Sequence, residues 1–184
     1  MIWEAFTLNI ANKLTVLRLA LVPVFVILML IGSRSAAVLG AVVFTIASFT
    51  DFLDGHLARK HNLVTTFGKF LDPLADKILT ISGFIILVEQ GIIPAWGVII
   101  IVARELAITG FRIIAASEDI TIAASPFGKL KTITQLASLI ALLFSPPIPQ
   151  GIGVFIFYIA VILTVLSGID YFVKNKTVLD LENM

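Results

Sequence analysis

Six apolar stretches of helical length, separated by short turn-forming segments, constrain the fold of this chain more than any other feature of its sequence. An α-helix needs roughly 20 apolar residues to cross a bilayer, so six spans leave no room for a second folded domain. We therefore expect an all-α integral membrane protein with six transmembrane helices, forming a single domain over residues 1–184. The fifth span is long enough only if its basic start, Lys129 to Thr132, is counted as an interfacial end. The expected apolar stretches are Leu14–Ile31, Ala36–Ala58, Pro73–Val88, Ile93–Ala116, Thr132–Phe144 and Gly153–Phe172.

The composition excludes several other classes of protein. Hydrophobic residues make up 59% of the chain and charged residues only 14%, where about 25% charged residues would be usual in a soluble domain. The mean hydropathy is +1.07 and the formal net charge is +1, which excludes a water-soluble globule, a disordered chain and a nucleic-acid binder with a basic surface. Because the chain has no cysteine, a bound metal needs oxygen or imidazole ligands.

The distribution of Lys and Arg predicts the orientation of the spans. Basic residues near span ends stay on the cytoplasmic side of a membrane. With the N-terminus inside, the outer connections hold only Arg34, so we expect both termini in the cytoplasm. The small size and the lack of an organellar transit segment indicate a bacterial inner membrane. The basic residues on the expected cytoplasmic side are Lys13, Arg18, Arg59, Lys60, Lys69, Lys129, Lys131, Lys174 and Lys176.

The residues before the first span allow two interpretations. Ile2, Trp3, Phe6 and Leu8 are consistent with a short amphipathic helix lying on the membrane, and a disordered start is the alternative. A cleaved signal peptide ending at the small residues 35–37 is a weaker hypothesis. The apolar stretch before them is longer than the about 7–15 residues of a signal core, and it contains Arg18.

Four acidic residues lie where an apolar helix would ordinarily exclude them. Asp51 and Asp54 are three residues apart near the cytoplasmic end of the second span, and Asp72 and Asp76 are four apart at the start of the third. These spacings place each pair on one helix face, and the short connection makes the two spans antiparallel neighbours. Acids within a membrane need a partner. Since four converging carboxylates repel one another, we predict one or two Mg²⁺ or Mn²⁺ ions.

Some of these residues have simpler interpretations when taken singly. Asp72 precedes Pro73 and could be a helix N-cap. Asp76 and Lys77 could form ordinary interfacial pairs. Arg59 offers a donor fork suited to phosphate, or it is a positive-inside anchor. None of these alternatives explains all four acids together.

The acids form part of a longer pattern. Asp51-Phe-Leu-Asp54-Gly55-His-Leu-Ala58-Arg59, eight residues, then Gly68-Lys-Phe-Leu-Asp72-Pro-Leu-Ala-Asp76 matches without departure DxxDGxxAR, eight residues, GxxxDxxxD. In this the chain resembles the CDP-alcohol phosphatidyltransferase family. Residues 9–15 with Arg18 and Pro23 resemble the N-terminal segment of that family, although Ala11 stands where proline is common. Arg104-Glu105, Arg112 and residues 128–132 resemble the branch that makes phosphatidylglycerol phosphate, and the similarity covers about residues 9 to 135.

The resemblance implies a six-helix membrane enzyme, usually a homodimer, that transfers a phosphatidyl group from CDP-diacylglycerol to sn-glycerol 3-phosphate and releases CMP. It implies that four aspartates bind two divalent cations, Mg²⁺ or Mn²⁺, and that one of them is also the general base. The implied metal ligands are Asp51, Asp54, Asp72 and Asp76, with Asp76 as the base. The residues implied to bind CDP-diacylglycerol are Gly55, Ala58, Arg59, Thr65 and Gly68.

The acceptor is a dianion, so cations near the cytoplasmic side are the candidate residues that bind its phosphate. They are Arg104, Arg112, Lys129 and Lys131. Arg104 and Glu105 could instead form a buried structural pair, and the two lysines could be anchors for lipid headgroups. The same signature also fits enzymes that use inositol phosphate, serine or phosphatidylglycerol as acceptor.

Two hypotheses from other classes fit less well. A divalent-cation transporter would need polar residues that continue toward the outer face, yet the outward ends of the second and third stretches are almost entirely apolar. A small structural membrane protein would leave the cluster of carboxylates without an explanation.

Overall fold

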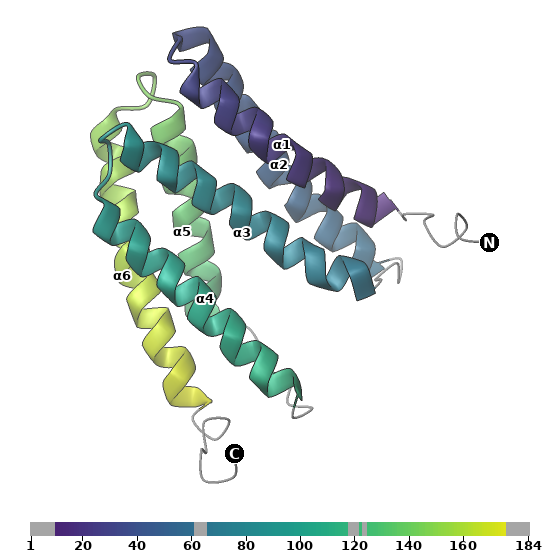
Figure 1. Cartoon of the computed structure of the whole chain (residues 1–184). Coiled ribbons are helices and arrows are strands. Elements are labelled where there is room, and N and C mark those ends of the chain that lie inside the picture. Colours follow the sequence, from purple (N-terminus) through teal and green to yellow (C-terminus); the bar gives the residue numbers. More distant parts are fainter. Residues whose placement is uncertain (1–9, 61–65, 118–121, 123–124, 176–184) are drawn as a thin grey trace, which may run out of the picture. The chain divides into compact units, whose positions relative to one another are not determined.

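The structure is a computed structural model. It describes the backbone of residues 10–60, 66–117, 122 and 125–175, and the side chains of residues 14–50, 74–115, 122 and 125–175. In these residues the chain forms six α-helices and no strand, which confirms the expected all-α fold (Figure 1). The expected interfacial helix falls on residues 1–9, outside the described residues. The helices are α1 (Ile10–Leu30), α2 (Arg34–Lys60), α3 (Thr66–Glu89), α4 (Ala95–Ser117), α5 (Pro126–Leu143) and α6 (Gln150–Lys174).

Five of the six described helices begin earlier than their expected apolar stretches, and α3 and α5 do so by the most residues. The third stretch was expected from Pro73, but α3 begins at Thr66. The fifth was expected from Thr132 with a basic interfacial start, and α5 begins at Pro126. Ser125 caps α5, since its Oγ accepts a hydrogen bond of 3.1 Å from the N–H of Gly128. Pro126 occupies the first helical position, where a backbone N–H would have no acceptor within the helix. Polar and basic residues thus extend both helices beyond their apolar parts.

The helices group into two units, Met1–Ile86 and Leu87–Met184, and the boundary falls inside α3. The expectation of a single domain stays a prediction. In the first unit α1 and α2 pack on each other after a turn at Gly32, whose φ of +75° favours glycine. Phe25 and Phe44 form the centre of this contact, with ring centroids 5.3 Å apart. Ser33 Oγ accepts a hydrogen bond from the N–H of Ala36 in the first turn of α2.

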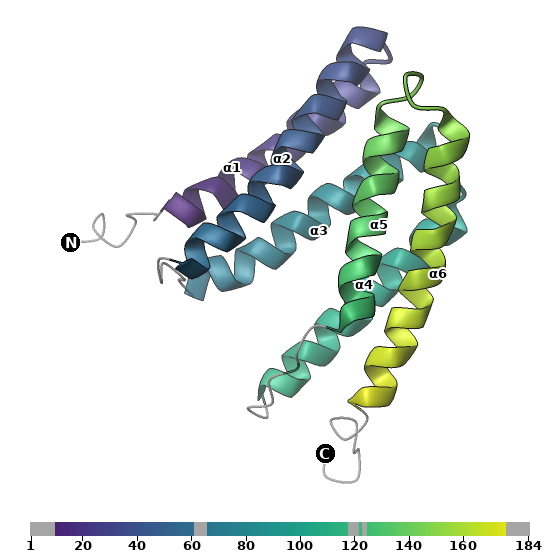
Figure 2. The ribbon, with the colours of Figure 1, turned by 180° about the vertical axis from the view of Figure 1, so that it is seen from behind.

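In the second unit α6 packs against both α4 and α5 (Figure 2). The contact between α5 and α6 is close enough to require a glycine, because a Cβ on Gly153 would lie 2.6 Å from the Leu142 side chain. Small residues allow this close approach between apolar helices. Ser138 Oγ donates across the same contact to the carbonyl of Gly153 at 3.1 Å. The unit therefore holds α4, α5 and α6 in fixed register near the residues discussed below.

Within the described part of the chain, one helix is both long and apolar enough to cross a membrane by length and composition, namely α6. Two shorter apolar helical stretches are Leu14–Leu30 and Arg34–Thr50. In α4, the charged residues Arg104, Glu105 and Arg112 interrupt the apolar length, and α5 begins with Lys129 and Lys131. The polar residues that make the chain a candidate enzyme thus shorten the apolar stretches of its helices.

Candidate functional site

The four aspartates lie on two consecutive helices. Asp51 and Asp54 fall in the last three turns of α2, and Asp72 and Asp76 fall in the first three turns of α3. Helical backbone at all four positions preserves the spacings of three and four residues that put each pair on one face. Because α3 continues through Asp72 and Pro73 from Thr66, the alternative that Asp72 is an N-cap is wrong.

The side chains of residues 51–73 lie outside the described part of the structure, as does the whole of Thr65. Gly55, Ala58 and Arg59 belong to the last turns of α2, and Gly68 belongs to the first turn of α3. Among the side chains that are described, no three acids or histidines come together. The donor set still fits hard divalent cations, since four carboxylates on continuous helices are oxygen ligands at fixed spacing. The roles of these residues stay predictions.

Asp76 is the one of the four aspartates whose side chain is described. It is half-buried on α3, where Thr80 Oγ1 donates a hydrogen bond of 2.9 Å to the main-chain carbonyl of Asp76. On α1, one turn apart, Thr15 and Arg18 are buried, with Arg18 only 2% exposed. We expected Arg18 among the basic residues on the cytoplasmic side. Its burial shows that α1 has a buried polar face, which the distribution of Lys and Arg does not predict.

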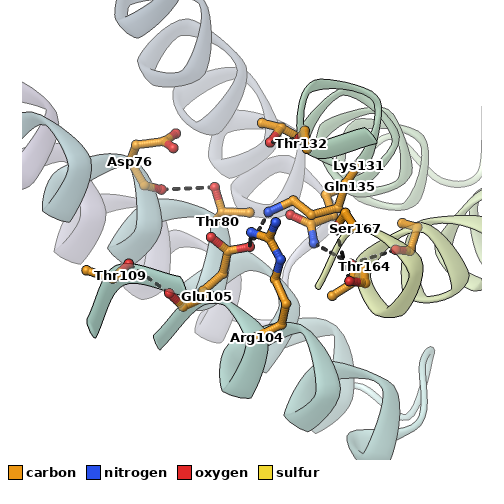
Figure 3. A network of polar contacts seen from close by, with 12 residues as sticks. Asp76, Thr80, Arg104, Glu105, Thr109, Lys131, Thr132, Gln135, Thr164 and Ser167 are labelled. Carbon is orange, nitrogen blue, oxygen red and sulfur yellow. Dashed lines mark hydrogen bonds and ion pairs between the residues drawn. The ribbon is translucent and has the colours of Figure 1, made fainter. Parts of the chain in front are cut away.

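The second unit contains a buried ion network centred on Glu105. The Oε1 atom of Glu105 accepts from Arg104 Nη1 on the same helix at 3.3 Å and from Lys131 Nζ on α5 (Figure 3). Lys131 is 4% exposed, so it is not an anchor in the headgroup region. The ion pair between Arg104 and Glu105, which the sequence offered as an alternative to acceptor binding by Arg104, is present. Two cations, one from α4 and one from α5, therefore share one carboxylate.

Glycines on two neighbouring helices lie close to the Arg104 side chain. A Cβ on Gly168 of α6 would lie 3.4 Å from Arg104 Cγ, and one on Gly128 of α5 would lie 4.0 Å from Arg104 Nη2. The guanidinium thus lies beside the N-terminal turn of α5. Its Nε is buried and makes no hydrogen bond with the described residues, so the Arg104 guanidinium keeps a donor for a further acceptor.

A buried hydrogen-bond chain follows the ion network along α5 and α6. Gln135 Nε2 donates to Thr164 Oγ1 at 3.1 Å, and Thr164 Oγ1 donates to the carbonyl of Ala160 at 2.7 Å (Figure 3). Ser167 Oγ donates to the carbonyl of Thr164 at 3.0 Å. A buried polar group without a partner destabilises a fold, and here each hydroxyl and the amide of Gln135 have one. The hydrogen bond between Gln135 and Thr164 fixes α5, the helix that carries Lys131, against α6.

Arg112 has a different environment from Arg104. Its side chain is exposed, and its Nε donates to the Tyr171 hydroxyl of α6 at 3.3 Å. The guanidinium carbon lies 5.7 Å from the centre of the Tyr171 ring. Lys129, in the first turn of α5, is exposed. Of the four predicted acceptor cations, Arg104 and Lys131 therefore meet on Glu105, whereas Arg112 and Lys129 remain at the surface.

Sequence reasoning missed several residues of this region. Tyr171, Gln135 and Thr164 were not among the candidates, and Glu105 was considered only as the partner of Arg104. A glutamine and a threonine within apolar stretches are a signal that sequence reasoning could have used, because polar groups in such stretches need partners. Tyr171 carries no such signal, since its partner lies 59 residues earlier in the chain.

Comparisons with known proteins identify the family to which the chain belongs. The CDP-alcohol phosphatidyltransferase family matches residues 8–166. A Bacillus subtilis protein named CDP-diacylglycerol--glycerol-3-phosphate 3-phosphatidyltransferase is 45% identical over an alignment of 192 positions. The alignment covers 95% of this chain and 99% of the relative. A Rickettsia typhi protein of the same name is 38% identical, covering 92% and 98% of the two chains. A Mycobacterium tuberculosis protein named probable phosphatidylglycerophosphate synthase is 40% identical, covering 89% and 79%.

Proposed function

Because the chain belongs to the CDP-alcohol phosphatidyltransferase family, we propose that it transfers the phosphatidyl group of CDP-diacylglycerol to sn-glycerol 3-phosphate and releases CMP. The observation that carries this proposal is the similarity along 95% of the chain to a relative named for that reaction. The cations of α4 and α5 support an acceptor that carries a phosphate, because an acceptor without net charge, such as serine, would not need them.

In this reaction an acceptor hydroxyl oxygen forms a bond to the lipid phosphorus of CDP-diacylglycerol. The bond between that phosphorus and the oxygen of CMP breaks, and CMP leaves with the electron pair. The hydroxyl proton passes to the carboxylate of Asp76, which is the proposed general base. Asp51, Asp54, Asp72 and Asp76 would hold divalent cations, which when bound would supply charge neutralisation for the phosphoryl group and the leaving group. The residues proposed to hold the donor substrate are Gly55, Ala58, Arg59, Thr65 and Gly68.

The cations of the second unit divide the work of holding the acceptor. Arg104 and Lys131 are fixed on Glu105 before any substrate arrives. Arg112 and Lys129 are exposed and can approach a ligand directly. A preorganised cation gives more binding energy than a free one, because its side-chain entropy is already lost in the folded state.

The protein works in a membrane. Large apolar side chains are exposed on the helices of both units, and on α4 they recur every seven residues at Ile99, Leu106 and Ile113. Exposed apolar surface of this extent is typical of lipid contact. All six helices cross the bilayer in this proposal, with both termini in the cytoplasm of a bacterial cell, and the enzyme forms a homodimer. Its lipid substrate, CDP-diacylglycerol, then already lies in the same membrane.

Product analysis tests the reaction. Purified protein in detergent is given CDP-diacylglycerol, Mg²⁺ and glycerol 3-phosphate labelled in its phosphate. We expect label to enter the lipid phase in a one-to-one ratio with released CMP. Release of CMP without label in the lipid phase would mean that water is the acceptor, and it would overturn the proposed transfer.

A further inference from the structure

The end of α4 and the end of α6 meet at one polar contact. Arg112 lies near the end of α4 and Tyr171 near the end of α6, and their side chains meet through a hydrogen bond of 3.3 Å from Arg112 Nε to the tyrosine hydroxyl. The guanidinium also lies over the ring, 5.7 Å from its centre. An exposed arginine ordinarily samples many rotamers. This one is held at two places by a single neighbour.

Tyr171 is itself fixed in position. It is 2% exposed and packs against Phe111 in an edge-on contact with ring centroids 5.6 Å apart. Ile108 and Phe172 complete the apolar cluster around it. Its main-chain carbonyl accepts from the side-chain amide of Asn175 at 2.8 Å. The hydroxyl of Tyr171 is thus a rigid acceptor at the surface of a packed aromatic cluster.

The geometry leaves a defined edge of the guanidinium available. Nε is used by the tyrosine, and the two Nη atoms of Arg112 have no partner among the described residues. Two N–H groups on parallel donor atoms match two oxygens of a phosphate group. Held on the ring, the side chain presents that edge without a further loss of rotamer freedom on binding.

We propose that Tyr171 is a positioning residue that orients the guanidinium of Arg112 for the phosphate of the acceptor. The inference rests on the proposed function, since it takes glycerol 3-phosphate as the ligand of Arg112. It adds a specificity residue on α6, a helix that the sequence pattern connects with neither the metal ligands nor the acceptor. Tyr171 acts through Arg112 and does not itself contact the reacting atoms.

The test uses Tyr171→Phe, which removes the hydroxyl and keeps the ring. CMP release is measured while glycerol 3-phosphate is varied at saturating CDP-diacylglycerol, and then the reverse. We expect the KM for glycerol 3-phosphate to rise about threefold to tenfold, the range of one ordinary hydrogen bond. The kcat and the KM for CDP-diacylglycerol should change less than twofold. A purely structural role would lower Tm and leave the acceptor KM unchanged, which would overturn the inference.

The chain offers a matched control, because it contains two tyrosines. Tyr158 packs against Trp96, with ring centroids 6.1 Å apart, and Tyr158→Phe should leave both KM values unchanged. In an Arg112→Ala background, Tyr171→Phe should add no further rise in acceptor KM. Multiplicative effects of the two substitutions would contradict positioning through Arg112.

The outcomes separate this inference from the proposed function. If the wild-type protein releases no CMP with glycerol 3-phosphate, both the function and the phosphate ligand of Arg112 are wrong. If the wild-type protein is active and Tyr171→Phe keeps the wild-type acceptor KM, only the role of Tyr171 is wrong. Stabilisation by glycerol 3-phosphate in a thermal shift gives a readout without turnover, and the shift should be smaller in Tyr171→Phe.

Discussion

The acidic segment of residues 51–76 and the cationic segment of residues 104–131 encode their chemistry in different ways. The acids stand at fixed spacings on two consecutive helices, so local sequence alone places each pair on one face. The cations lie on α4 and α5, and their environments differ because Lys131 and Arg112 have partners on other helices. A site with helical spacing can be predicted from sequence, whereas a site assembled from tertiary contacts needs the structure.

Removing an acid should have the largest effect. We expect Asp51→Ala, Asp54→Ala and Asp72→Ala each to lose CMP release to background, because the proposed cation centre loses an oxygen ligand. The measurement is CMP release in a Mg²⁺ titration. Asp170→Asn is the matched control, since Asp170 pairs with Lys174 at 2.7 Å near the end of α6 and should retain activity. Wild-type rates in the three alanine variants would remove the acidic segment from the chemistry.

Glu105→Gln tests whether the buried cations depend on their shared acid. The substitution removes the carboxylate that Arg104 and Lys131 share, and breaking a buried pair in this way costs up to about 3–5 kcal/mol of folding free energy. Lys131→Met should destabilise less, because Arg104 still neutralises Glu105. Thermal unfolding in detergent measures the difference. Equal loss of stability in the two variants would contradict the network as described.

Arg112→Ala should act on the acceptor and not on the fold. The side chain is exposed, so Tm should change little, while loss of a charged hydrogen-bonding partner worth about 1.5–3 kcal/mol raises the acceptor KM roughly 10-fold to 100-fold. Steady-state kinetics with glycerol 3-phosphate as the varied substrate check this. An unaltered acceptor KM in the folded variant would remove Arg112 from the site.

Lys129→Ala should have the smallest effect of the four. Lys129 is exposed in the first turn of α5, and a solvated charge acts mainly through long-range attraction, which salt screens. We expect a rise of about twofold to threefold in acceptor KM at low ionic strength, which disappears as salt is added. A rise that persists at high salt would place Lys129 in direct contact with the acceptor.

Much of the fold could be predicted from the sequence, because apolar stretches and the breakers between them determine helices directly. The described residues form six helices, as predicted, and the expected basic extension before Thr132 is helical, although α5 begins earlier still, at Pro126. The start of α3 was not, because Pro73 reads as a first helical residue while the polar residues before it also form helix. The apolar pattern alone underestimates the length of a helix whose first turns are polar.

The candidate site divides along the same line. Arg104, Arg112 and Lys131 could be found as charges within or beside apolar stretches. The burial and orientation of their side chains could not be predicted, since burial of Lys131 depends on Glu105 of another helix and the orientation of Arg112 depends on Tyr171. All four cations were predicted to bind the acceptor, and in the structure Lys131 is buried, Arg104 is half-buried, and Arg112 and Lys129 are exposed.

Acceptor choice tests the central claim most directly. Purified protein in detergent with CDP-diacylglycerol and Mg²⁺ is offered glycerol 3-phosphate, inositol phosphate, serine and phosphatidylglycerol separately, beside the Asp76→Asn variant. Release of CMP with glycerol 3-phosphate alone, reduced at least about 100-fold in Asp76→Asn, is the result that we predict. Release with a different alcohol would contradict the proposed acceptor, and no release with any of the four would contradict phosphatidyl transfer itself.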